Sequence, residues 1–180
     1  MSGTVGDNTA RASGVIASAG GGGKILQVQS YSTAALSSQS DTSSFVDISS
    51  FLVTLTPAAT DSRIWINVSV GMFGCSGEAA IFAVERAISG GTTELCPPVG
   101  TVSSARLGGH GRGFSDGTNY GSAVNFGILD VTHNTTSEIT YQLQWAVQAQ
   151  AYLNRSYNDA NDAVYGARTV SGITAWEIGA

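Results

Sequence analysis

Basic residues are scarce in this sequence. Only eight of its 180 residues are lysine or arginine, Lys24 is the single lysine, and the formal net charge is −5. Phosphate binding requires clustered lysine and arginine, whereas the arginines here are scattered, which argues against nucleic acid as a partner. The same shortage argues against a helix that lies on a membrane surface. Charged residues of both signs make up only 12% of the chain, roughly half the usual share.

Long apolar runs and cysteines are also few. No stretch approaches the roughly 18 apolar residues of a transmembrane helix, and the start of the chain lacks the basic and apolar regions of a signal peptide. We therefore expect no membrane partner, and synthesis in a cytoplasm. The two cysteines, Cys75 and Cys96, are 21 residues apart. We favour two buried free thiols, and a disulfide stays open.

Alternation of apolar and polar residues is the dominant pattern of the chain. In residues 63–72, isoleucine and valine occupy every second position from Ile64 to Val70, as expected of a half-buried strand. We count about eight to ten short strands and no convincing amphipathic helix, which predicts an antiparallel β-sandwich or jelly roll. The main predicted strands begin near Ile25 and cover residues 45–48, 51–56, 63–72, 79–88, 123–131, 139–150 and 169–178.

Two segments do not follow this pattern. Residues 1–23 contain almost no large apolar side chains beyond Val5, Val15 and Ile16, and they end in four glycines, so we expect flexibility when the chain is alone. Such a segment is either a disordered tail or an arm that attaches to a partner through those three side chains. We predict an arm over 1–23 and a β-sandwich domain over 24–180. Residues 97–121 are glycine-rich and predicted to be irregular.

No motif of the chain indicates catalysis, and we expect neither an enzyme nor a cofactor. His110 and His133 would need a neighbouring nucleophile and a carboxylate, which sequence proximity cannot supply. Residues 108–113 lack the lysine and the helix of a phosphate-binding loop. Paired carboxylates for glycoside cleavage must lie about 5–10 Å apart in a cleft. For Glu78, Glu85 and Glu94 we favour solvated positions on strand faces.

The polar loop 154–166 is the best candidate for a ligand site. Asp159 and Asp162 are weak candidates for a metal ion, because the spacing does not match a calcium loop, and an Asx-rich turn is favoured. Exposed tyrosines beside asparagines can stack on a sugar and bind its hydroxyls. The residues proposed for that role are Tyr157, Asn158, Asn161 and Tyr165. The three tryptophans, predicted to pack in the core or between subunits, are Trp65, Trp145 and Trp176.

Four stretches carry a resemblance to known proteins: GDNTARASG (6–14), GGGKILQV (21–28), SFVDI leading to LVTLTP (44–57) and LNRSYNDANDAVYGARTVSGITAWEI (153–178). Through them the chain resembles a family of small structural proteins of tailed phages, common in marine and cyanobacterial phages. The resemblance implies a β-sandwich head that assembles as a homotrimer. It also implies that the N-terminal segment attaches this head to the virion.

These observations predict a virion protein made in the cytoplasm of the host bacterium. With 180 residues the chain is shorter than a typical tail fibre, which favours a capsid decoration, cement or short head-fibre protein. Its expected partners are other copies of itself and, through residues 1–23, the major capsid protein or another virion protein. The alternative is a tail-fibre or receptor-binding protein that recognises a host surface glycan through residues 108–121 or 154–166. A polysaccharide-cleaving hydrolase ranks last.

Overall fold

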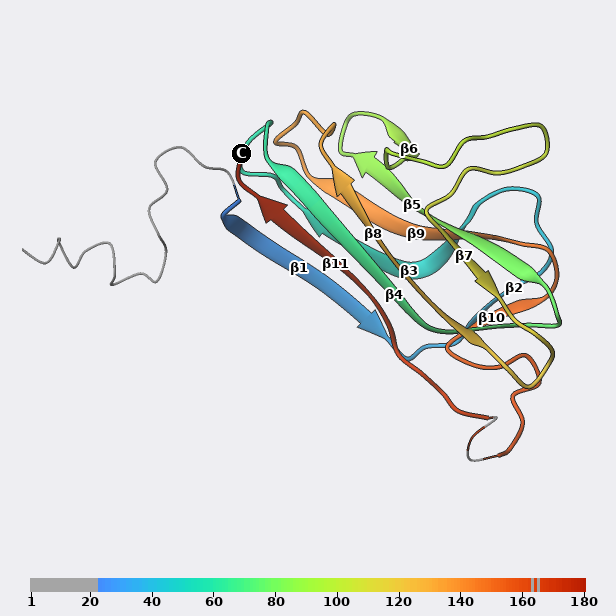
Figure 1. Cartoon of the computed structure of the whole chain (residues 1–180). Coiled ribbons are helices and arrows are strands. Elements are labelled where there is room, and N and C mark those ends of the chain that lie inside the picture. The colour runs from blue at the N-terminus through green and yellow to red at the C-terminus, as the bar shows by residue number, and fades with distance from the viewer. Residues whose placement is uncertain (1–22, 163, 165) are drawn as a thin grey trace, which may run out of the picture.

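The computed structural model describes residues 23–162, 164 and 166–180, and every regular element in this part is a β-strand. The strands form two antiparallel sheets that pack face to face (Figure 1), so the predicted antiparallel sandwich is confirmed. None of the described elements is a helix that could span a membrane. The strands are β1 (Ile25–Thr33), β2 (Ser37–Gln39), β3 (Val46–Leu55), β4 (Arg63–Cys75), β5 (Ala79–Ile88), β6 (Thr93–Leu95), β7 (Gly111–Phe114), β8 (Ser122–Asp130), β9 (Ile139–Val147), β10 (Ala151–Leu153) and β11 (Ser171–Ile178).

Eight of these strands pair as one long hairpin folded over on itself. β1 pairs with β11, β3 with β9, β4 with β8, and β5 with β7, so early strands meet late ones in nested order. The β4–β11 pairing then joins the β1–β11 and β4–β8 pairs into one sheet, and the β5–β9 pairing joins the β3–β9 and β5–β7 pairs into the other. The first sheet contains the order β1-β11-β4-β8 and is completed to six strands by β10 and β2, and the second contains β3-β9-β5-β7 and is completed to five by β6. This nested pairing is the double Greek key of a jelly roll.

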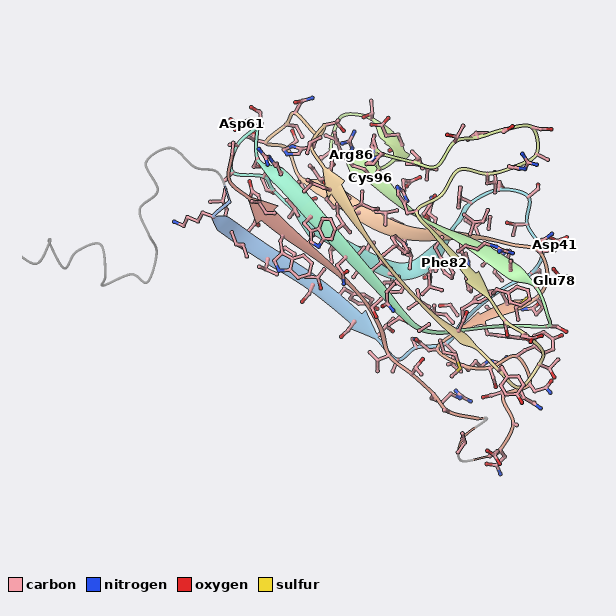
Figure 2. All side chains as sticks on the ribbon, viewed as in Figure 1. Asp41, Asp61, Glu78, Phe82, Arg86 and Cys96 are labelled. Carbon is pink, nitrogen blue, oxygen red and sulfur yellow. The ribbon has the colours of Figure 1, made fainter. Side chains whose placement is uncertain are left out.

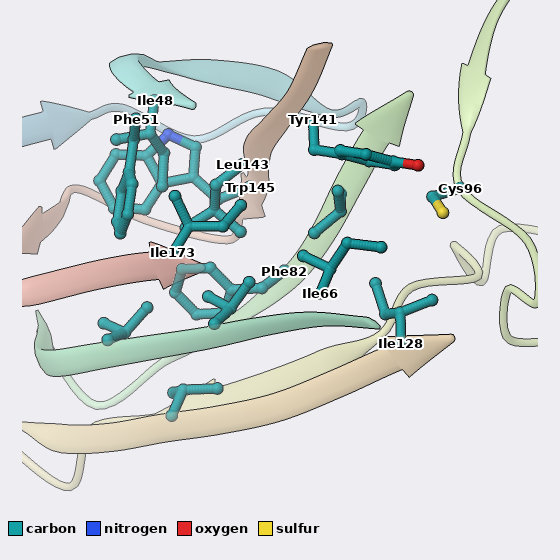
Figure 3. Packing of buried hydrophobic residues seen from close by; sticks show 14 of the residues in the cluster. Ile48, Phe51, Ile66, Phe82, Cys96, Ile128, Tyr141, Leu143, Trp145 and Ile173 are labelled. Atoms are coloured by element: carbon teal, nitrogen blue, oxygen red, sulfur yellow. The ribbon is translucent and has the colours of Figure 1, made fainter. Parts of the chain in front are cut away.

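The core lies between the two sheets and is built from the alternating positions of their strands. Ile66 of β4 faces Phe82 of β5 and Leu143 of β9 in the packed interior (Figure 3). All three are fully buried, and burial of such a side chain is worth about 1.5–3 kcal/mol. Trp145 is also buried, with its ring centroid 6.3 Å from that of Phe82. The prediction that alternate residues of 63–72 and 79–88 face opposite sides of their strands is therefore confirmed.

The predicted irregular segment 97–121 was partly wrong, because it contains β7. Gly113 of β7 points into the core, where an added Cβ would lie 3.0 Å from Phe73 and Val124. Only glycine fits there without displacing these neighbours. Because glycine carries no apolar side chain, this inward-facing position leaves no hydrophobic signal in the sequence.

Other strand boundaries also differ from the sequence prediction. The two strands predicted at 45–48 and 51–56 are one strand, β3, with a register shift between Asp47 and Leu52. Ser50 lies in this irregular region with a φ of 60°, a left-handed conformation that lets the strand bend. The strand predicted over 139–150 ends at Val147, and β10 pairs separately with β2 and β4. The last strand begins at Ser171 rather than residue 169.

The two ends of the described chain lie side by side. The Gly23 N–H donates to the Gly179 carbonyl at 2.9 Å, and the Gly179 N–H donates to the Lys24 carbonyl at 2.8 Å. Residues 1–22, with Val5, Val15 and Ile16, lie outside the described residues. Asp41 lies at the opposite end of the sandwich from the C-terminus (Figures 1 and 2).

A buried ion pair joins the two sheets at the end of the sandwich near Cys96 (Figure 2). The Nη1 atom of Arg86 on β5 donates to both carboxylate oxygens of Asp130 on β8, at 2.7 and 2.8 Å. The Tyr141 hydroxyl on β9 donates to Asp130 at 2.8 Å, and the Thr132 backbone N–H donates at 2.9 Å. Arg86 also forms an ion pair with Glu94. The Asp130 carboxylate thus connects three strands drawn from both sheets.

These contacts shift the ionisation of the buried groups. Burial alone would raise the pKa of Asp130, but hydrogen bonds from Arg86, Thr132 and Tyr141 lower it below its usual value. Burial alone would lower the pKa of Arg86, but its hydrogen bonds to Asp130 and Glu94 raise it. For Tyr141, burial and the nearby Asp130 carboxylate both raise the pKa. The tyrosine therefore stays protonated and the aspartate ionised at neutral pH.

Both cysteines are free thiols and buried, in line with the favoured expectation. Cys96 lies close to the Arg86–Asp130 ion pair in the fold (Figure 2), and burial raises the pKa of its thiol. Burial likewise raises the pKa of Cys75. Protonated thiols are poor nucleophiles, so both cysteines act as small apolar side chains of the core.

Replacing Asp130 with asparagine should destabilise the protein by about 3 kcal/mol or more, because Arg86 keeps its charge and loses its buried carboxylate. Urea unfolding of wild type and D130N at pH 7 measures this loss. The stability difference should be full above the usual carboxyl pKa of about 4 and should shrink as the pH falls through the lowered pKa of Asp130. A difference near zero at pH 7 would contradict this assignment.

Candidate functional site

The polar loop that follows β10 is held by internal contacts. Asn154, which begins it, is fully buried, and its side-chain amide donates to the Thr33 carbonyl at 3.0 Å and the Ala35 carbonyl at 2.9 Å. The Ser171 hydroxyl donates to the Asn154 amide oxygen at 2.6 Å. Asparagine tolerates the left-handed φ of 65° found at this position. Asn154 therefore ties the loop to the segment after β1 and to the start of β11.

The two aspartates proposed as weak metal candidates have protein partners. The Asp159 carboxylate accepts from Arg168 at 2.7 Å and lies 3.5 Å from Arg155. One Asp162 oxygen accepts from the Val164 backbone N–H at 2.8 Å, which is an Asx turn. Among the described residues, no group of three or more His, Cys, Asp or Glu side chains is placed to hold a metal ion.

The residues proposed for sugar binding make different contacts. The Asn158 side chain donates to the Thr118 hydroxyl and the Asn119 amide oxygen, both at 2.9 Å, which joins this loop to residues 115–121. The Tyr157 ring packs edge-on against Tyr152, with centroids 5.7 Å apart. Asn161 is exposed, and Tyr165 lies outside the described residues. The role of these four residues in sugar binding therefore stays a prediction.

The glutamates weighed for glycoside cleavage do not form a pair. Glu94 binds Arg86, whereas Glu85 projects from the other face of β5. There the Gln144 amide donates to Glu85 at 3.0 Å and to Asp47 at 2.8 Å. Glu78 lies at the opposite end of the sandwich from Arg86 (Figure 2). These carboxylates therefore lie on different faces and at different ends of the fold.

Both histidines bind backbone groups. The His133 Nε2 atom lies 2.8 Å from the Ser62 carbonyl. The His110 Nδ1 atom accepts from the Val84 N–H at 3.0 Å, and its Nε2 atom lies 2.8 Å from the Cys96 carbonyl. Because an N–H donates to Nδ1, the proton of neutral His110 belongs on Nε2. The imidazole thus fills the edge of β5 between the segments that pair with β6 and β7.

Replacing His110 with alanine should cost about 1–3 kcal/mol at pH 7.5, because the Val84 N–H loses its acceptor. Burial lowers the pKa of His110, so the unfolded chain takes up the proton first as the pH falls below about 6.5. The stabilisation is present above that pH and decreases as the pH falls through the lowered pKa. Urea unfolding of wild type and H110A should show a smaller difference in unfolding free energy at pH 5 than at pH 7.5. An equal or larger difference at pH 5 would contradict the proposed role of neutral His110.

A row of large apolar side chains crosses the outer face of the first sheet. Val28 of β1 is the register partner of Trp176 on β11, Trp176 of Trp65 on β4, and Trp65 of Leu129 on β8. Trp65 is 39% exposed, Val28 48% and Leu129 37%. The Trp65 ring lies over Gly127, where any Cβ would collide with it. We call these four residues, one from each strand, the apolar row.

Within the described residues, the edge strand β1 of this sheet carries few of the features that protect an edge. β1 contains no charged residue and no proline, and among the described strands it pairs only with β11. Ile25 and Leu26 at its start are 54% and 41% exposed. Natural sheets usually protect such an edge with charge, proline or a covering segment. The apolar row and the β1 edge together make the outer face of the first sheet the best candidate for an interface.

Sequence reasoning grouped the three tryptophans, but the structure separates them. Trp145 lies in the core, while Trp65 and Trp176 lie on the outer face of the first sheet. The alternation that sends Ile64 inward places Trp65 outward, so its exposure was visible in the sequence. The sequence did not show that Trp65 lies beside Trp176, because the register between distant strands has no local sequence signal.

Comparisons with known proteins return structural similarity only. No protein-family model and no curated protein matches the chain. Among solved structures it is similar to infectious bursal disease virus Gx strain, with 15% identity, a TM-score of 0.36 and coverage of 86% of this chain and 40% of that chain. It is also similar to the VP2 subviral particle of that virus, with 12% identity, a TM-score of 0.36 and coverage of 86% of this chain and 40% of that chain. The chain thus spans less than half the length of these solved chains.

Proposed function

We propose that this protein is a non-enzymatic structural protein of a tailed-phage virion. It is a capsid decoration, cement or short head-fibre protein that forms a homotrimer and attaches through residues 1–23 to the major capsid protein or another virion protein. The apolar row on the outer face of the first sheet is the observation that carries this proposal. The resemblance of four sequence stretches to small phage structural proteins supports it.

The absence of charge on this face allows another copy to be its occupant. Each copy carries a net charge of −5, so two copies repel unless their contact avoids like charges. The apolar row and β1 carry no charge and so meet that condition. A stable interface buries about 1,200 Å² or more. Four partly exposed side chains cannot supply that area, so the contact must include the β1 edge.

A non-enzymatic role fits the contacts of the groups weighed for catalysis. His110 and His133 bind backbone atoms, Glu94 binds Arg86, and Glu85 accepts from Gln144. None of these contacts orients a side-chain nucleophile, as a hydrolase that forms a covalent intermediate would require. The thiols of both cysteines are buried.

Replacing Trp65 and Trp176 together with serine should convert a trimer into monomers, because the centre of the apolar row is lost. Size-exclusion chromatography with light scattering measures the mass. The matched control is Val102→Ser, which removes an apolar side chain that is 68% exposed and lies away from the row. A W65S/W176S protein that remains trimeric, or a wild type that is monomeric at micromolar concentration, would rule out this interface.

Deleting residues 1–23 should leave a folded trimer that no longer attaches to particles. Purified phage lacking the protein, incubated with wild-type or truncated protein and sedimented, shows which of them binds. Alanine at Val5, Val15 and Ile16 in the full chain tests the predicted anchors without shortening it. Equal sedimentation of truncated and wild-type protein would contradict attachment through this segment.

A further inference from the structure

A hollow of about 730 Å³ opens near the end of the sandwich that lies away from the chain termini. Its size lies within the range of small-molecule sites, about 300–1,000 Å³. Ile81 of β5 and Ala146 of β9, which are register partners, form its apolar floor. Two segments form its walls: residues 41–43, whose Thr42 N–H donates to the Val147 carbonyl at 2.8 Å, and residues 105–107.

Glycines hold the second wall against the sheet. A Cβ at Gly108 would collide with the Gly100 carbonyl, and a Cβ at Gly109 would collide with the Ile81 side chain. The His110 N–H donates to the Phe82 carbonyl at 2.8 Å, which fixes this segment on β5. The glycine-rich stretch therefore has a definite geometry that places Arg106 and Leu107 over the hollow.

Two arginines line the hollow without a carboxylate partner. Arg112 of β7 is the register partner of Ile81, and Arg106 belongs to the wall above it. Within the described part of the chain, neither guanidinium forms an ion pair. The Arg112 guanidinium lies over the Phe114 ring, 6.0 Å from its centroid. The two arginines are two of only eight basic residues in a chain of net charge −5, so their shared place in the lining of one hollow favours an anionic ligand.

The other polar groups of the hollow specify the ligand further. Thr42, Ser43 and Gln148 offer hydroxyl and amide groups. Asp41 offers a carboxylate, which accepts hydrogen bonds and repels a bare anion such as phosphate. A ligand that suits both Asp41 and the arginines carries hydrogen-bond donors, such as hydroxyls, as well as a negative group. It must also have an apolar face to lie on Ile81 and Ala146.

We propose that this hollow binds an acidic saccharide. The sugar carboxylate pairs with Arg112 and Arg106, for which the planar guanidinium is well shaped. The sugar hydroxyls donate to Asp41 and exchange hydrogen bonds with Thr42 and Gln148, and the ring lies over the floor. This site is separate from the apolar row and from residues 1–23, so its presence does not depend on the proposed assembly.

Isothermal titration calorimetry with trigalacturonate, and with its methyl ester as the uncharged match, tests the proposal. Trigalacturonate should bind at least about tenfold more tightly than the ester, and added salt should weaken it. R112A and R106A should each weaken binding about tenfold, as expected for loss of a charged hydrogen-bonding group, while R112K should retain part of it. The control R63A removes an exposed arginine from the first sheet and should bind as wild type does.

Equal binding of acid and ester, no measurable binding at millimolar ligand, or unchanged binding by both R106A and R112A would each overturn the saccharide site. Thermal unfolding of each variant confirms that it is folded. Sedimentation with phage particles is measured separately on the same variants. Loss of saccharide binding with normal particle attachment leaves the proposed virion role intact, and failure of attachment with normal saccharide binding leaves the site intact.

Discussion

The buried pair between Arg86 and Asp130 is the contact on which the arrangement of the two sheets depends. Burying two opposite charges is costly, and the cost is offset only where further hydrogen bonds satisfy the remaining polar atoms. Here Thr132 and Tyr141 donate to Asp130 and Glu94 pairs with Arg86, while the buried Arg86 Nε atom has no partner among the described residues. Those partners come from loops and strands on both sides of the core, so their geometry is met in one packing of β5, β8 and β9.

The two sheets differ in how one of their edges is covered. On the second sheet, β6, β7 and the His110 imidazole together occupy the outer edge of β5. On the first sheet, β1 has no such cover among the described residues and carries no charge. Edge strands without protection invite pairing with another chain. The edge strand without charge therefore belongs to the sheet that carries the apolar row, whereas β3, at the far edge of the second sheet, carries Asp47 and a register shift.

Local sequence patterns predicted most of the strands, whereas the contacts between distant strands could not be predicted from them. The alternation from Ile64 to Val70 predicted β4 and its buried side, because period-two burial is written in neighbouring residues. β7 escaped prediction, since Gly113 faces the core without an apolar side chain. The Arg86–Asp130 pair joins residues 44 positions apart, and the polar loop 154–166 gave no sign that Arg155 and Arg168 would engage Asp159. Nested pairing of distant strands leaves no mark in a short window of sequence.

The adjacency of Gly23 and Gly179 has a practical consequence for handling the molecule. Because these residues are hydrogen-bonded neighbours, a short linker can join them without bending either β1 or β11. The sandwich then becomes a closed ring that can be opened at an exposed turn such as that between β5 and β6, giving a circular permutant with the same core. Such rearranged chains would carry their new ends at a chosen turn, so that a peptide can be fused there and displayed away from the original termini.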